Sequence, residues 1–162
     1  MDNPIRIETL EKVLDRQIAW IESANTRTAT AITLATAMLG VLAALSPAKG
    51  LPWTWLQCLF VGLSVLSLLL CLLMCVLAVF PRTKGPEDSM IFFGPIARRD
   101  RKDFIAAAKT LTAEEYSLDL AAQVHINAQI AKTKFRWVHW AMRAFFVSIL
   151  PWVVAVYFFY QG

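Results

Sequence analysis

The apolar and charged positions divide the chain into charged segments and three long runs without strong charge. Near the N-terminus, apolar residues recur at three- and four-residue spacing, which predicts an amphipathic helix over residues 1–27. Because no Gly or Pro lies between Ile5 and Leu39, we expect this helix to continue into the first uncharged run, Thr28–Leu45. That run approaches the ~20 residues that a helix needs to cross a bilayer.

A second uncharged run follows a short segment of helix-breaking residues. Ser46–Pro52 contains two Pro and one Gly and predicts a tight connection between antiparallel helices. Leu56–Phe80 has no charge and consists mainly of Leu, Val, Cys, Phe and Met, which predicts a second span that ends at Pro81. The sequence therefore predicts a transmembrane hairpin over residues 28–80, with spans 28–45 and 56–80.

Residues 81–136, between the second and third uncharged runs, are predicted to form a loop followed by helices. Arg82–Gly94 contains Gly and Pro and is expected to be a loop, and Arg98–Lys109 has the spacing of a short amphipathic helix. Thr112 and Glu115 have the spacing of a capping box, which predicts the start of another helix. Apolar residues then share one face of that helix, namely Tyr116, Leu120, Val124, Ala131, Phe135 and Val138.

The third span is predicted within residues 137–162. Its uncharged part, Ala144–Tyr160, continues the preceding helix without an intervening Gly or Pro until Pro151. Aromatic residues flank it on both sides, as expected at membrane interfaces, and Arg143 is placed to extend toward the nearer interface. The predicted fold class is an all-α membrane protein with three transmembrane helices, cytoplasmic helical stalk extensions and a short amphipathic helix.

Composition supports this assignment and the Lys and Arg positions orient it. A hydrophobic content of 57%, a charged content of 17% and a mean hydropathy of +0.52 exceed what a soluble domain of this size carries. Ten Lys and Arg lie in residues 81–137 and four in residues 1–27, against one in residues 46–53. The positive-inside rule therefore predicts that the N-terminus and residues 81–136 are cytoplasmic and that the C-terminus lies on the outer side of the membrane.

No pattern in the sequence predicts an enzyme, a metal centre or a cofactor site. His125 and His139 lack acidic or Cys partners at ligand spacing, and Cys71 and Cys75 lie within an apolar run where packing is the expected role. The net charge of +4 is too small to predict binding to a nucleic acid polymer.

Small residues at four-residue spacing occupy one face of the first span, at Thr36, Gly40 and Ala44. This pattern lets transmembrane helices approach closely. It predicts either self-association into a homo-oligomer or packing against the other spans of the same chain, and the sequence favours neither.

A basic cluster follows an aromatic pair in the segment between the second and third spans. Its cations are Arg98, Arg99, Arg101 and Lys102, and the aromatic residues are Phe92 and Phe93. Such an arrangement offers several charge-assisted donors beside an aromatic platform. The alternative is a basic surface that contacts anionic lipid.

Short motifs follow one another in a definite order relative to the predicted spans, namely Trp20–Arg27, Pro81, Phe92–Ile96, Glu114–Tyr116, and Lys132 with Lys134. This order resembles that of the Pycsar transmembrane effector family, whose members are bacterial antiphage proteins partnered with a pyrimidine cyclase. The family favours Asp followed by Lys where this chain has Asn25 and Arg27.

The resemblance implies an abortive-infection membrane effector that is activated by a cyclic nucleotide second messenger and then impairs the inner membrane. The expected ligand is a cyclic pyrimidine mononucleotide made by a partner cyclase, and the basic cluster with its aromatic pair is the expected ligand site. The alternative is a constitutive membrane scaffold or channel subunit that binds a protein partner through its cytoplasmic helices.

Overall fold

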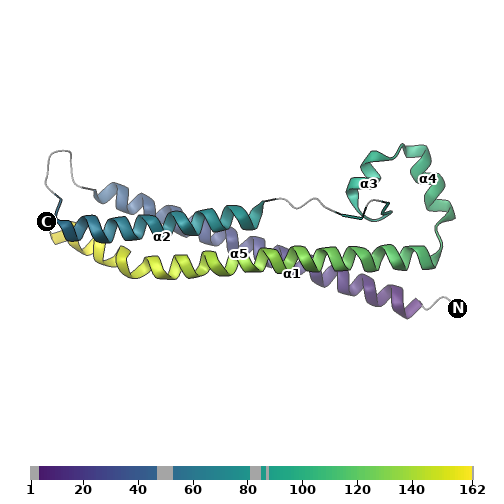
Figure 1. The fold of residues 1–162 in the computed structure, drawn as a ribbon, viewed down its shortest axis with the longest axis horizontal. Coiled ribbons are helices and arrows are strands. Elements are labelled where there is room, and N and C mark those ends of the chain that lie inside the picture. The colour runs from purple at the N-terminus through teal and green to yellow at the C-terminus, as the bar shows by residue number, and fades with distance from the viewer. Residues whose placement is uncertain (1–3, 47–52, 81–84, 87, 162) are drawn as a thin grey trace. The chain divides into compact units, whose positions relative to one another are not determined.

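A computed structural model describes residues 4–46, 53–80, 85–86 and 88–161, and those residues form helices and connections without a β-strand (Figure 1). Three of the helices are long and apolar enough to cross a membrane. The predicted all-α class with three spans is therefore confirmed. The expected connection at Ser46–Pro52, apart from its first residue, and the helix stop at Pro81 lie outside the described residues. The helices are α1 (Pro4–Leu45), α2 (Trp55–Val79), α3 (Phe93–Arg98), α4 (Arg101–Thr110) and α5 (Ala113–Gln161).

The chain divides into two compact units. The first unit comprises Met1–Ser23 and Pro81–Thr133, and the second comprises Ala24–Phe80 and Lys134–Gly162. Helices α1 and α5 each contribute residues to both units. Both helices are continuous, which confirms the prediction that each amphipathic segment runs directly into its span.

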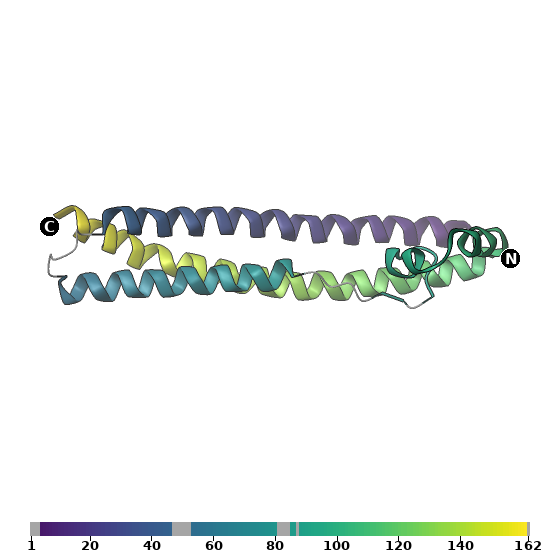
Figure 2. The ribbon, with the colours of Figure 1, turned by 90° about the horizontal axis from the view of Figure 1, so that it is seen from above.

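In the second unit, small side chains bring α1, α2 and the C-terminal part of α5 together, and the three helices run side by side in Figure 2. Small residues at helix interfaces in membranes allow backbones to approach closely and so increase van der Waals contact. The alternating spacing of four and three residues matches the repeat of left-handed helix packing. The buried residues on these seams include Ala24, Thr28, Ala31 and Ala35 of α1, Ser64, Leu68, Cys71 and Cys75 of α2, and Val138, Ala141, Ser148 and Ala155 of α5.

Few polar contacts cross these seams, and several hydroxyls along the spans donate to backbone carbonyls one turn earlier in their own helix. The indole Nε1 of Trp152 donates to the carbonyl of Met38 at 3.0 Å, which ties α5 to α1. The hydroxyl of Thr28 donates to the carbonyl of Ala24 in the preceding turn. At the start of α2, Thr54 forms a capping box with the side chain of Gln57, a cap that sequence analysis did not identify.

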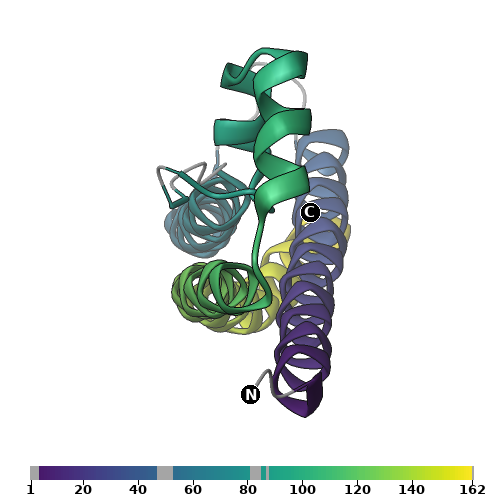
Figure 3. The ribbon, with the colours of Figure 1, turned by 90° about the vertical axis from the view of Figure 1, so that its right-hand side faces the viewer.

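In the first unit, α3 and α4 form a pair of short helices whose leading loop is tied to α5 (Figure 3). The backbone N–H of Met90 donates to Asp119 Oδ2 at 2.7 Å. The buried hydroxyl of Ser89 accepts from the backbone N–H groups of Ile91 and Phe92. These bonds satisfy the donors that precede α3 and fix the loop on the first turns of α5.

The short helix predicted over Arg98–Lys109 is present as α4, but its predicted start was three residues too early, because α3 ends at Arg98 and α4 begins at Arg101. Arg99 and Asp100 both adopt extended backbone conformations, and Asp100 occupies the N-cap position of α4. By contrast, the predicted capping box of α5 is confirmed, since Thr112 and Glu115 exchange side-chain and backbone hydrogen bonds.

Candidate functional site

The break between α3 and α4 determines how the basic cluster is presented. Arg98 lies in the last turn of α3, and Arg101 and Lys102 lie in the first turn of α4. All three are exposed, and within the described part of the chain no ion pair or hydrogen bond engages their charged groups. Three cations are thus available to an external anion over two adjoining helix ends.

Arg99 differs from its neighbours because its guanidinium is held by the chain itself. It donates to the sulfur of Met90 and to the carbonyl of Asp88, the latter at 3.2 Å, and its ion pair with the Asp88 carboxylate is loose at 3.9 Å. Arg99 therefore fastens α3 to its leading loop, a role that the sequence did not indicate.

The two aromatic residues also have different environments. The Phe92 ring is half-buried and lies against Gly85 and Gly94, where an added Cβ on Gly85 would collide with it. Phe93 is 62% exposed, and its ring centroid lies 4.6 Å from that of Phe92. Phe93 is therefore the ring with a face open to a ligand, whereas Phe92 is a packing residue behind it.

The small-residue face of the first span lies on the exposed side of α1 within the second unit. Thr36, Gly40 and Ala44 are exposed, and a Cβ added at Gly40 would meet nothing within 4 Å. The close packing within the chain uses the opposite face of α1, including Ala31 and Ala35, which are 1% and 0% exposed. The sequence left two roles open for the face with Thr36, Gly40 and Ala44, namely self-association and packing within one chain. The second role is performed by other residues of α1.

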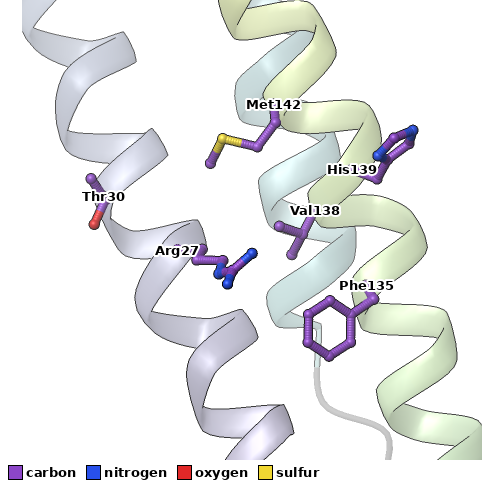
Figure 4. A pocket seen from close by; sticks show the side chains of 6 residues that line it. All are labelled: Arg27, Thr30, Phe135, Val138, His139 and Met142. Atoms are coloured by element: carbon purple, nitrogen blue, oxygen red, sulfur yellow. The ribbon is translucent and has the colours of Figure 1, made fainter.

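A cavity in the second unit, which sequence analysis did not identify, lies between α1 and α5 and has a volume of about 480 Å³. Its lining residues are Arg27, Thr30, Phe135, Val138, His139 and Met142. In Figure 4, the Arg27 side chain extends from α1 toward α5, and the side chains of Val138 and Met142 extend from α5 toward α1. His139 lies at the outer edge of α5. The cavity thus combines one guanidinium with a largely apolar wall.

Next to this cavity, Lys134 is 9% exposed and its ammonium donates to Asn25 Oδ1 at 2.7 Å. Both residues belong to motifs on which the family resemblance depended. The structure therefore pairs the Asn25 side chain with α5 and leaves Arg27, two residues later, on the cavity. The motif order drew attention to both residues, but Asn25 and Lys134 lie 109 positions apart, so the sequence did not reveal that they are bonded to each other.

Charge is strongly segregated along the chain. Every Asp and Glu lies before Ser23 or between Glu87 and Asp119, so the segments of the second unit contain none. The same segments contain five basic residues, namely Arg27, Lys49, Lys134, Arg136 and Arg143. The guanidiniums of Arg136 and Arg143 lie over the rings of Trp137 and Trp140, at 5.4 and 5.0 Å from the centroids.

Two titratable groups at the start of α5, outside the spans, have shifted pKa values. Hydrogen bonds from the backbone and hydroxyl of Thr112 lower the pKa of Glu115, because they stabilise the ionised carboxylate. The hydrogen bond from the Tyr116 hydroxyl to Glu11 Oε1, at 2.9 Å, raises the pKa of Tyr116 because it stabilises the neutral phenol. The contact with Thr112 caps the first turn of α5, and the contact with Glu11 joins α5 to α1 within the first unit.

Comparison with known proteins gives one match. The family model of the Pycsar effector protein domain matches residues 9–161, which include all five helices in whole or in large part. No curated protein and no solved structure matches the chain.

Proposed function

The chain belongs to the Pycsar effector family and is an antiphage defence effector, and from this premise we propose that a cyclic mononucleotide made by a partner cyclase activates it to impair the bacterial inner membrane. The observation that carries the proposal is the family match over residues 9–161 together with three helices able to cross a bilayer. The N-terminus and the segment between the second and third spans face the cytoplasm in this proposal, where the nucleotide is made.

The ligand site we propose is the basic cluster of the first unit. Arg98, Arg101 and Lys102 are exposed and free to donate to a cyclic phosphate, and the exposed ring of Phe93 offers a stacking face to the base. Arg99 supports the site by holding α3 to the preceding loop. A ligand that bridges the ends of α3 and α4 would favour the arrangement of helices to which it binds more tightly.

The route from this site toward the membrane follows contacts to α5. The loop that precedes α3 is anchored on Asp119, one turn from Tyr116, which in turn bonds to Glu11 of α1. Helices α1 and α5 are unbroken from these contacts into the predicted spans. A continuous helix transmits rotation instead of absorbing it at a hinge, so a change in the first unit can turn the spans.

Membrane impairment requires more than one copy, because three spans do not enclose a wide water-filled path. We propose that copies associate through the exposed face of α1 that carries Thr36, Gly40 and Ala44. The hydroxyl of Thr33, on the same exposed face of α1, already donates to the backbone carbonyl of Ala29 one turn earlier. Its lone pairs are available to water if this face turns toward the centre of an oligomer.

The test is titration of the purified full-length protein with cyclic UMP, cyclic CMP, cyclic AMP and cyclic GMP. Arg98→Ala combined with Arg101→Ala should lower affinity for the active nucleotide at least tenfold, because hydrogen bonds to charged groups contribute roughly 1.5–3 kcal/mol each. Arg99 is left intact, since its loss would disturb the loop. Arg16→Ala, another exposed arginine in the first unit, is the matched control and should bind normally.

A second measurement addresses the membrane. Co-expression with the cognate cyclase should admit a membrane-impermeant dye into cells, and the double variant should prevent dye entry. Growth arrest with intact dye exclusion would reject membrane impairment. Absence of binding to every nucleotide would instead favour a scaffold that responds to a protein partner.

A further inference from the structure

Within the described residues of the second unit, Arg27 is the arginine whose guanidinium has no partner. Arg136 and Arg143 lie over tryptophan rings, whereas Arg27 makes no cation–π contact with any ring in the part of the chain that the structure describes. Among residues 4–46, 53–80, 85–86 and 88–161, no hydrogen bond or ion pair engages its guanidinium. Its side chain instead extends over the cavity between α1 and α5 (Figure 4).

The second unit contains no acidic residue that could pair with this exposed guanidinium. No Asp or Glu occurs in the segments Ala24–Phe80 and Lys134–Gly162, so any anion that binds Arg27 comes from outside the unit. Arg27 is also the last charged residue before the uncharged run of α1. A guanidinium has five N–H donors in a planar fork, which matches the oxygens of a phosphate group.

The wall of the cavity limits the chemistry of the anion. Val138 and Met142 give it an apolar surface that continues along α5 in the direction of the predicted span, and Phe135 adds an aromatic ring. A volume of about 480 Å³ lies within the range of small-molecule sites. A small inorganic anion would leave the apolar wall in contact with water, whereas an anion attached to an apolar or aromatic body would cover it.

We propose that this cavity binds a singly charged phosphodiester, with its phosphate on Arg27 and the attached body against Val138, Met142 and Phe135. Two molecules of this chemistry reach such a site: an anionic phospholipid such as phosphatidylglycerol, and a free cyclic mononucleotide. Basic pockets between membrane-spanning helices bind anionic headgroups in this way. The site is separate from the basic cluster at Arg98, and the proposal does not depend on that cluster.

The test measures retained ligand on the full-length protein by native mass spectrometry. Protein in neutral detergent is supplied with phosphatidylglycerol or with zwitterionic phosphatidylcholine in one arm, and with cyclic UMP and cyclic CMP without lipid in the other. Arg27→Gln removes the charge at the cavity, and Arg136→Gln removes an equal charge from an exposed arginine elsewhere in the same unit. Thr30→Trp keeps every charge but fills the rim of the cavity.

Wild-type protein is expected to retain phosphatidylglycerol over phosphatidylcholine, or to retain a cyclic nucleotide, and retention should fall about tenfold in Arg27→Gln. Thr30→Trp should lower the same retention, and Arg136→Gln should leave it unchanged. The arm that responds identifies the source of the phosphodiester. Equal retention by wild type and Arg27→Gln in both arms, or an equal loss in Arg136→Gln, would overturn the site. Because the lipid arm contains no nucleotide, a negative result in that arm says nothing against the proposed activation by a cyclic nucleotide.

Discussion

Two leucine substitutions on opposite faces of α1 separate packing within one chain from association between chains. Ala35→Leu adds bulk at a position that is 0% exposed and lies in the core cluster of the second unit. Gly40→Leu adds more atoms, but it does so at an open position, where an added Cβ would meet nothing within 4 Å. The two variants carry the same new side chain, five positions apart on one helix.

The magnitudes follow from these environments. Overpacking a filled core costs about 1–3 kcal/mol, so Ala35→Leu should lower the free energy of unfolding of the single chain by that amount. At Gly40 an added Cβ meets nothing within 4 Å, so Gly40→Leu is expected to cost no overpacking and to gain roughly 0.8 kcal/mol in helix propensity, as measured in water. The single-chain stabilities of the two variants should therefore differ by roughly 2–4 kcal/mol, with Gly40→Leu the more stable.

Stability is measured by circular dichroism during unfolding in mixed detergent micelles, and association by energy transfer between labelled copies in the same micelles. Gly40→Leu is expected to weaken association while leaving the single chain folded. If Gly40→Leu destabilises the single chain as much as Ala35→Leu does, the assignment of the two faces is wrong. If energy transfer is unchanged in Gly40→Leu, association does not use this face.

Two further predictions concern the first unit. Tyr116→Phe removes the hydrogen bond to Glu11. The stabilising effect of this bond is fully present below pH ~10 and is lost as pH rises through the raised pKa of the phenol. The free energy of unfolding of wild type should therefore exceed that of the variant by about 1 kcal/mol at pH 8, and a difference that persisted unchanged at pH 12 would contradict this. Gly85→Ala should displace the Phe92 ring and lower the melting temperature. Gly62→Ala is the control and should leave the melting temperature unchanged, because an added Cβ there meets nothing within 4 Å. Equal melting temperatures of the two variants would show that the ring is not held against Gly85.

The helices were predictable because their signals are local. The absence of charge from Leu56 to Phe80 identified α2 to within one residue at each end. The capping box at Thr112 and Glu115 correctly located the start of α5. Each of these signals depends on residues that are close in sequence, so no knowledge of tertiary contacts was needed.

Features that depend on distant residues were not predictable. The break after Arg98 carries no Gly or Pro, and it accompanies the contacts that Arg99 makes with Asp88 and Met90. Both faces of the first span are rich in small residues, so spacing alone did not reveal that the face with Ala35 is the one that packs. The cavity beside Arg27 was missed because its other wall comes from α5, more than a hundred positions later.

Because all acidic residues lie in segments of the first unit, a protease specific for Asp and Glu would cut the first unit and not the second. A protease that cleaves after Asp and Glu finds its sites only in residues 2–22 and 87–119. Complete digestion would therefore remove the acidic segments and leave two uncut fragments, Ser23–Glu87 and Leu120–Gly162, which between them carry all three predicted spans. Whether these fragments still hold together in detergent would measure how much of the association of α1, α2 and α5 resides in their small-residue seams alone.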